Sequence, residues 1–296
     1  MIERFLTYLR CELNYSAHTV RAYEHDLLLL ARFLNGEEAT EFDPAAVTLS
    51  DLRAWISEQA SRGLTARTLR RRTLAARTLF HFLRRAGLLE RNPAADLPLP
   101  RLPAPLPAFV REEDIERILD EQTLDTECFE EVRDRFIIEF LYSTGLRRAE
   151  LLSLRDADVD TSKGEVKVTG KRNKQRLVPL PPELCEHVER YRRLRDARFA
   201  ETPEAFLLAD SGRAMNNEAL SRIVKIQLSS ANVSRKTPHV LRHTFATAMV
   251  RHEARLDSVK ELLGHSSLAT TQIYTHLSFR ELQQNYQLAH PRAAKK

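Results

Sequence analysis

The stretch NPAADLPLPRLPAPLP, from Asn92 to Pro107, divides the sequence into two parts. Proline at this density removes backbone N–H donors, so the stretch cannot continue a helix and favours extended polyproline geometry. We interpret it as a semi-rigid linker between domains. The sequence therefore predicts a first domain over residues 1–92, a linker over 93–106 and a second domain over 107–296.

The residues before the linker show the hydrophobic periodicity of helices. Apolar residues recur at helical spacing in four segments, and Ser16, Ser50 and Thr65 precede three of them as candidate N-caps. This pattern predicts a compact four-helix module. The apolar sets begin with Ile2, Phe5, Leu6 and Leu9 and end with Leu69, Leu79, Phe80 and Leu83.

The fourth of these segments is strongly basic. From Ser61 to Arg91 the charged residues are arginines with the single exception of Glu90, whereas the residues before Ser61 are net acidic. Such asymmetry is typical of a nucleic-acid-binding face, although a solvated helix face shows the same pattern. The candidate DNA contacts, which share one side of the helix, are Arg67, Arg70, Arg71 and Arg77.

The second part of the chain is mostly helical and contains one β-hairpin. Gly145 is placed to end a helix as its C-cap. The stretch GEVKVTGKRNKQRLVPLP, from Gly164 to Pro181, alternates apolar and polar residues around a basic turn, which predicts two antiparallel strands. The expected fold is mainly α, with the N-terminal four-helix domain followed by an α+β domain that carries a small antiparallel sheet.

Composition restricts the class of protein. The net charge of +5 favours a polyanionic partner. No apolar run approaches the length that spans a bilayer, and the N-terminus does not resemble a signal peptide. The three cysteines are scattered and odd in number, which argues against a disulfide framework and indicates a reducing, cytoplasmic environment.

Two short segments carry residues suited to a phosphate group. In TPHVLRHTFATAMV, Pro238 marks a helix start, and His239 and Arg242 project from its first turn, where free N–H groups favour anions. The helix end should also lower the pKa of His239. His239 and His243 have the spacing of zinc ligands, but no acidic third ligand lies nearby in the sequence. In YSTGLRRAELLSL, Glu150 is placed to orient Arg147.

Five fragments in this order resemble the tyrosine site-specific recombinases, the phage-integrase family. They are TGLRRAEL, GKRNKQR, HVLRHTFAT, LGH and a tyrosine nine residues after that histidine. The segment NYSAHTVRAYEHDL is similar to the core-binding, SAM-like domain of the same family. Chain length and the closing HPRAAKK are most similar to the Xer branch.

The resemblance assigns a catalytic set. Tyr274, whose own stretch of sequence favours a core aromatic, becomes the nucleophile, and His239 becomes its proton acceptor. The resemblance gives Lys171 the role of general acid toward the leaving 5′ oxygen. The remaining assignments are two phosphate-binding arginines and a second histidine, so that the full set is Arg147, Lys171, His239, Arg242, His265 and Tyr274.

The resemblance also implies a function without a cofactor or metal. The chain is expected to cut and rejoin double-stranded DNA through a 3′-phosphotyrosyl intermediate, in chromosome or plasmid dimer resolution. The alternatives are integration of a mobile element, a non-catalytic DNA-binding protein and a metal-dependent nuclease. The chain is expected to form a tetramer on two DNA sites, either with copies of itself or with a related second recombinase. A DNA-translocase accessory protein is a further expected partner.

The C-terminal tail, residues 278–296, has two interpretations. Its apolar residues Phe279, Leu282 and Tyr286 share a helical face that needs burial. Burial in its own domain is the simpler possibility. The resemblance to the family predicts instead that the tail docks in a neighbouring subunit.

Overall fold

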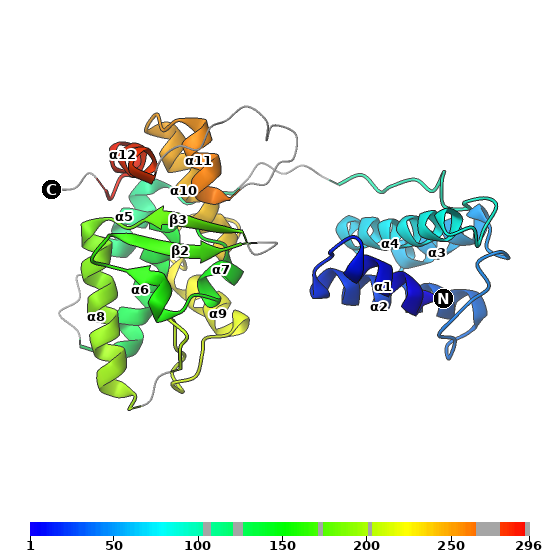
Figure 1. Cartoon of the computed structure of the whole chain (residues 1–296), viewed down its shortest axis with the longest axis horizontal. Helices are drawn as coiled ribbons and strands as arrows, with labels where there is room; N and C mark the ends of the chain where they lie inside the picture. Colours follow the sequence, from blue (N-terminus) through cyan, green and yellow to red (C-terminus); the bar gives the residue numbers. More distant parts are fainter. Residues whose placement is uncertain (103–107, 121–126, 171–173, 201–202, 265–278, 294–296) are drawn as a thin grey trace. The chain divides into compact units, whose positions relative to one another are not determined.

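A computed structural model describes the chain in six segments: residues 1–102, 108–120, 127–170, 174–200, 203–264 and 279–293. The chain forms two compact units, Met1–Pro105 and Leu106–Lys296, each with its own hydrophobic core. Figure 1 colours the first unit blue to cyan and the second green to red. The fold is mainly α with one small antiparallel sheet, as the sequence predicted.

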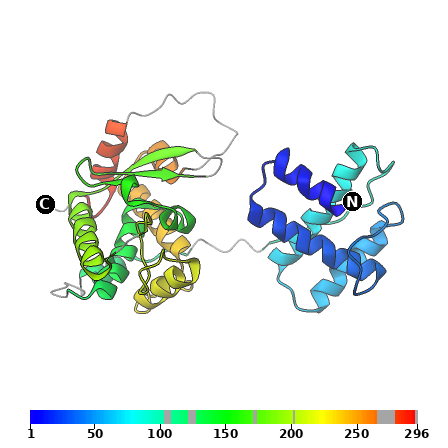
Figure 2. The same ribbon diagram turned by 60° about the horizontal axis from the view of Figure 1, so that its bottom comes forward.

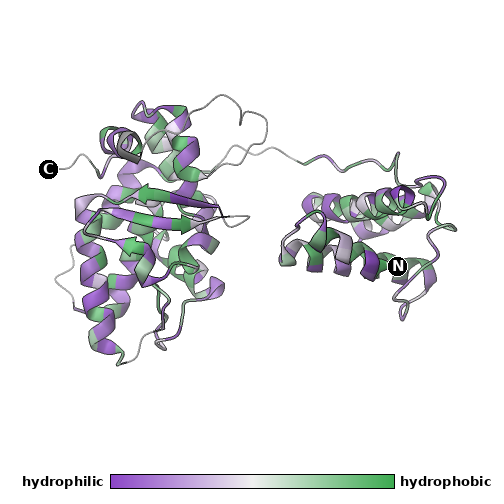
Figure 3. Ribbon diagram, viewed as in Figure 1, coloured by the Kyte–Doolittle hydropathy of each residue, from purple (hydrophilic) through white to green (hydrophobic). Residues whose placement is uncertain are grey.

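The first unit is the predicted four-helix module over its described residues, 1–102. Its helices are α1 (Ile2–Cys11), α2 (Ala17–Asn35), α3 (Leu49–Ser61) and α4 (Ala66–Arg85). Each helix carries both hydrophobic and hydrophilic residues (Figure 3), and its buried residues recur at helical spacing. The shared core includes the fully buried side chains of Phe5, Leu27, Trp55 and Phe80.

Side-chain caps fix where three of these helices begin. Ser16 and Thr65 accept backbone N–H groups at the starts of α2 and α4, as predicted. The predicted cap of the third helix was wrong. Thr48, not Ser50, is the N-cap of α3, because Thr48 and Asp51 form a reciprocal capping box in which the Thr48 N–H donates to the Asp51 carboxylate over 2.9 Å.

Part of the proline-rich stretch packs on the first unit. Ala94 and Leu97 are buried in its core. The Pro100 carbonyl accepts a hydrogen bond from Nη1 of Arg70 over 3.2 Å. The chain therefore remains attached to this unit beyond residue 92, where the sequence analysis placed the end of the first domain.

The second unit combines helices with the sheet. Its helices are α5 (Glu112–Asp120), α6 (Phe129–Thr144), α7 (Arg148–Leu152), α8 (Pro182–Arg198), α9 (Asn217–Gln227), α10 (Pro238–Arg251), α11 (Leu256–Leu263) and α12 (Phe279–Ala289), with a 3-10 turn η1 (Asp156–Asp158). Helix α6 is central, because it packs against α8, α9 and α10 and every residue from Phe136 to Thr144 is buried.

The sheet has the antiparallel order β1 (Val159–Asp160), β2 (Glu165–Thr169) and β3 (Gln175–Pro179). The hairpin β2–β3 was predicted, whereas the two-residue strand β1 was not. Val166 pairs with Val178, and Val168 pairs with Arg176. All three valines are buried, so Arg176 lies on the inward face. Strand β3 lies beside α11 and α12 (Figures 1 and 2).

Candidate active site

A glycine turn at the end of α6 positions Arg147. Gly145 adopts left-handed backbone geometry with φ of 61°, and its N–H donates to the Leu141 carbonyl, which confirms the predicted C-cap. The Phe245 ring packs against this glycine so closely that a Cβ would lie 2.4 Å from its Cδ1 atom. The chain then turns at once, and Arg147 becomes the N-cap residue of α7.

The carboxylate of Glu150 orients Arg147, as predicted. It accepts the backbone N–H of Arg147 and its Nη1, each over 2.8 Å. Glu150 is buried, and burial alone would raise the pKa of its carboxyl. Hydrogen bonds from Arg176 and Arg147 outweigh burial and hold the pKa of Glu150 below its ordinary value, so the group is charged.

Arg176, on β3, is the part of the site that sequence reasoning missed. Its Nη1 and Nη2 atoms donate to the two oxygens of Glu150 over 3.1 and 2.9 Å, a bidentate ion pair. The signal in the sequence was strand alternation, which places Arg176 on the same face as the buried Val178. An arginine on the inward face of a strand requires an anionic partner.

Arg242, on α10, is buried beside this ion pair. Its Nη1 donates to the Gly145 carbonyl over 2.7 Å and lies 3.9 Å from the Glu150 carboxylate. Burial and then the charge of Arg147 lower the pKa of Arg242 to about 10. The guanidinium still carries its charge at neutral pH, but burial deprives that charge of the solvation that an exposed arginine has.

The three arginines meet at the C-terminal end of α11. Within the described part of the chain, the carbonyls of Leu262, Leu263 and Gly264 accept one hydrogen bond each, in that order from Arg176, Arg242 and Arg147. These carbonyls have no partner within the helix, and the end of a helix carries a partial negative charge. Residues from β3, α10 and the α6–α7 turn are thereby joined at one point.

His239 lies one turn before Arg242 on α10. Its ring contacts that of His243 edge to face, with centroids 4.6 Å apart. Partial burial of the ring, then the neighbouring His243, Arg242 and Arg147, lower the pKa of His239, although the residue remains open to solvent. The lowered pKa was predicted, and it leaves the imidazole neutral and able to accept a proton at pH 7.

Three members of the predicted catalytic set lie outside the described residues: Lys171, His265 and Tyr274. In the sequence, Lys171 stands between β2 and β3, and His265 follows Gly264 directly. The structure brings together Arg147, Arg242 and His239, while the catalytic roles of all six residues remain predictions. Thr237 is the N-cap residue of α10, but its side chain makes no capping hydrogen bond.

The candidate DNA contacts on α4 lie opposite its buried face. Arg67 is exposed and Arg77 partly exposed. Arg70 is bonded to Pro100, as noted above, and Nη2 of Arg71 lies 3.1 Å from the fully buried carboxylate of Asp26. Two of the four arginines are therefore engaged within the unit, and their role in binding DNA stays a prediction.

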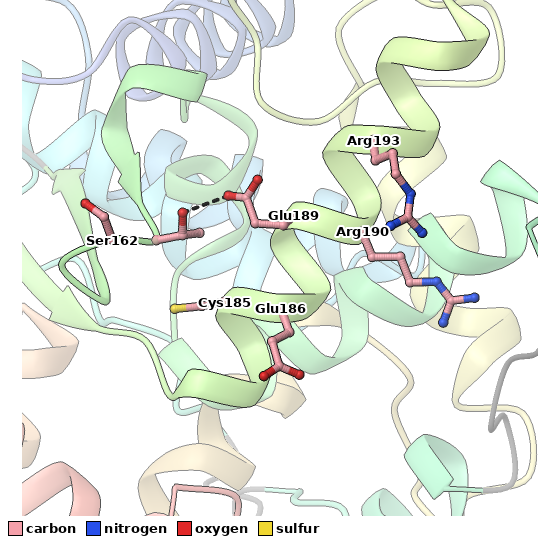
Figure 4. Close-up of a pocket in the computed structure, with 7 residues that line it drawn as sticks. Ser162, Cys185, Glu186, Glu189, Arg190 and Arg193 are labelled. Atoms are coloured by element: carbon pink, nitrogen blue, oxygen red, sulfur yellow. Dashed lines mark hydrogen bonds between the residues drawn. The ribbon is translucent and has the colours of Figure 1, made fainter.

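A shallow groove of about 690 Å³ lies on α8 (Figure 4), and the arginine cluster formed by Arg147, Arg176 and Arg242 does not line it. Its lining mixes acidic and basic side chains, and Thr161 donates to Glu189 across it over 2.7 Å. None of the lining residues belongs to the predicted catalytic set. The groove is lined by Thr161, Ser162, Cys185, Glu186, Glu189, Arg190 and Arg193.

The sequence matches two models of known protein families. Residues 108–281 match the model of the phage integrase family, and residues 2–87 match its N-terminal SAM-like domain. The chain belongs to the phage integrase family. The enzymes of this family cut and rejoin DNA strands, and the arginine cluster of the second unit lies within the matched region.

Full-length relatives support the same placement in the phage integrase family. The chain is 38% identical to the tyrosine recombinase XerC of Chlorobaculum tepidum, over 98% of this chain and 94% of the relative. It is 35% identical to XerC of Xanthomonas axonopodis pv. citri, over 100% and 98%.

Solved phage-integrase structures share the fold. A Tn1549 transposon integrase in complex with circular intermediate DNA has a TM-score of 0.70 at 20% identity, over 96% of this chain and 97% of that chain. XerH recombinase bound to palindromic difH substrate has the same TM-score at 21% identity, over 96% and 83%. Among the described residues of the present chain, no helix has the length and apolar content needed to cross a membrane.

Proposed function

We propose that the chain is a site-specific recombinase that cuts each DNA strand with Tyr274 and forms a 3′-phosphotyrosyl intermediate. The observation that carries this proposal is the convergence of Arg147 and Arg242 at the end of α11, with His239 one turn before Arg242 on α10. Two arginines fixed around one point suit the non-bridging oxygens of a phosphodiester in its transition state.

The proposed chemistry conserves the bond energy of the DNA strand. The phenolic oxygen of Tyr274 forms a bond to phosphorus as the bond to the 5′ oxygen breaks. His239 takes the phenolic proton, and its lowered pKa keeps the ring neutral at pH 7, so that the ring has a free nitrogen to accept that proton. Lys171 gives a proton to the leaving 5′ oxygen, and His265 joins the arginines as a donor. Attack by a 5′ hydroxyl reverses the step, so rejoining needs no nucleotide cofactor and no metal.

The proposed substrate is double-stranded DNA bound by both units. The arginines of α4 supply phosphate contacts from the first unit, and the cluster around Glu150 supplies them from the second. The Tn1549 integrase and XerH structures that share this fold are complexes with DNA, which supports this substrate class. A tetramer on two sites, in the cytoplasm and on the nucleoid, is the assembly we propose, made with itself or with a related second recombinase.

Dimer resolution of chromosomes or plasmids is the proposed biological role. It is supported by relatives named XerC that match nearly the whole chain. A DNA-translocase accessory protein belongs to the same proposal. Integration of a mobile element is the second candidate, favoured by the similarity to a transposon integrase. Sequencing the genomic DNA that co-purifies with the protein separates the two roles.

The test of the chemistry uses Tyr274→Phe on a nicked half-site, where the cleaved strand escapes and the adduct accumulates. We expect wild type to give a denaturation-resistant protein–DNA adduct in excess EDTA. Tyr274→Phe should bind the half-site with unchanged affinity and give no adduct, because only the phenolic oxygen is removed. An adduct of undiminished yield from the variant excludes Tyr274 as the nucleophile.

A further inference from the structure

We propose that Arg176 is a positioning residue of the strand-cleavage reaction. Arg176 balances the negative charge of Glu150, so that the positive charge of Arg147 remains available to the DNA phosphate. It also joins β3 to the end of α11. The proposal rests on the phosphate-binding role that we propose for Arg147.

The first argument concerns charge. The Glu150 carboxylate is 5% exposed and accepts hydrogen bonds from both Arg147 and Arg176. A buried carboxylate requires a cationic partner. If Arg176 is replaced by a neutral residue, Arg147 at 2.8 Å is the one remaining cation within hydrogen-bond distance of Glu150 among the described residues, because Arg242 is 3.9 Å away. An arginine whose charge is balanced by a buried carboxylate attracts a phosphate less strongly.

The second argument concerns exposure. The Arg147 side chain is 37% exposed, whereas that of Arg176 is 13% exposed. The Arg176 donors are directed inward, with Nη1 and Nη2 on Glu150 and Nε on the Leu262 carbonyl. The geometry therefore assigns the contact with DNA to Arg147 and a supporting position to Arg176.

The third argument concerns the connection between segments. Nε of Arg176 donates to the Leu262 carbonyl over 2.8 Å, and this bond joins β3 to α11. Gly264 permits the close approach, because a Cβ there would lie 3.1 Å from Nη1 of Arg176. In the sequence, Lys171 precedes β3 and His265 follows α11. Arg176 thus links the two elements from which the proposed acid and second histidine extend.

The experiment compares Arg176→Gln, Arg176→Lys and the double variant Arg176→Gln/Glu150→Gln in the full-length protein. Single-turnover adduct formation on the nicked half-site gives the rate, gel shifts give the affinity, and thermal unfolding checks that each variant is folded. We expect Arg176→Gln to slow adduct formation by about 10- to 100-fold, as seen for groups that orient metal ligands. Half-site affinity should change by less than about threefold.

The double variant is the decisive arm. Replacing Glu150 by glutamine removes the charge that competes for Arg147, so the double variant should react about tenfold faster than Arg176→Gln. Arg176→Lys should also recover part of the rate, since it restores the charge without the fork. If the double variant is as slow as Arg176→Gln or slower, Arg176 does not act as the counter-ion and the proposal is overturned.

Arg192→Gln is the matched control. Arg192 is 19% exposed, donates to the carboxylate of Glu189 over 2.9 Å and bonds the Val159 carbonyl, but it lies outside the arginine cluster. The Arg192→Gln variant should be less stable than wild type without forming the adduct more slowly. If Arg192→Gln and Arg176→Gln slow adduct formation equally, the effect of Arg176→Gln is general destabilisation. Arg147→Gln tests the underlying function separately, because a wild-type rate from that variant removes the proposed role of Arg147 itself.

Discussion

The hydroxyl of Tyr286 donates a hydrogen bond of 2.8 Å to the backbone carbonyl of Ser143. This bond ties α12 to the end of α6, four residues before Arg147. Tyr286 is 1% exposed, and α12 packs against α10, α11 and β3 of the same chain. The tail up to Ala293 is therefore packed on its own domain, the simpler of its two interpretations, while docking in a neighbouring subunit of an assembled recombinase stays a prediction.

Removing the tail should consequently damage the domain that carries it. We expect a chain ending at Leu277 to lose single half-site affinity as well as cooperativity, because the apolar surface covered by Tyr286 and Leu282 becomes exposed. The smaller change Tyr286→Phe should cost about 1 to 2 kcal/mol, since the buried Ser143 carbonyl loses its donor. Gel-shift titrations on one and two half-sites measure the first effect, and urea unfolding of the second unit measures the second.

Tyr15→Phe is the control for that substitution, because Tyr15 is exposed and belongs to the first unit, which has its own core. It should change the free energy of unfolding by less than about 0.5 kcal/mol. A truncated protein that binds one half-site and two half-sites like wild type would contradict the assignment of the tail to its own core.

Acid should weaken the packing of α12 through His290. The ring is 1% exposed, its Nε2 donates to the Tyr142 carbonyl over 3.4 Å, and its Nδ1 accepts the N–H of Arg292. Burial lowers the pKa of His290 to about 3, whereas an unfolded histidine has a pKa of about 6.5. The stability contribution is therefore complete above pH 6.5 and declines as the pH falls towards 3.

At pH 5 the free energy of unfolding should be about 2 kcal/mol lower than at pH 7.5 from this residue alone. Chemical denaturation at the two pH values, for wild type and His290→Phe, isolates the contribution. The variant should be less stable at pH 7.5 and should show a smaller pH difference by that amount. An identical pH difference in both proteins would mean that His290 is not buried in its neutral form.

Gly145→Ala should destabilise the second unit and inactivate it. The left-handed geometry costs an L-residue about 1 to 2 kcal/mol, and the contact with Phe245 adds an overpacking cost of about 1 to 3 kcal/mol. The Gly145 carbonyl also accepts from Arg242, so the turn cannot shift without moving that guanidinium. Unfolding experiments and adduct yield measure the two effects.

Gly87→Ala provides the comparison. Gly87 has φ of 72°, and a Cβ there meets nothing within 4 Å. It should cost about 1 to 2 kcal/mol in the first unit and leave adduct formation unchanged. Equal costs at both glycines would show that the Phe245 contact relaxes freely.

The arginines of α4 should differ in their response to substitution. Arg67→Ala and Arg77→Ala should each lower the slope of log affinity against log salt by about one, with unchanged thermal stability. Arg71→Ala should in addition destabilise the first unit by about 1 to 2 kcal/mol, because Asp26 is fully buried and loses a partner. Salt titrations on one half-site, with unfolding of the same variants, make the comparison. Unchanged slopes for Arg67→Ala and Arg77→Ala would assign this face to solvent.

The sequence by itself determined the features that depend on neighbours along the chain. The helices of the first unit, the Gly145 cap, the hairpin β2–β3 and the pairing of Arg147 with Glu150 all follow from spacings of a few residues. Hydrophobic periodicity and capping act over that range, which is why they can be read from the sequence. Motif order identified the family for the same reason, since it needs no knowledge of distances in space.

Tertiary structure decided how those local pieces meet. Arg176 is 26 residues from Glu150 and 86 from Leu262, and no periodicity relates such positions. The burial of α12 in its own domain was likewise undecided, because an amphipathic face requires a partner without specifying one. Polar burial decides the first outcome: the Glu150 carboxylate and the three carbonyls at the end of α11 need hydrogen-bond donors, and the nearby arginines supply them. Apolar burial decides the second, because Leu282 and Tyr286 pack into the core of the second unit.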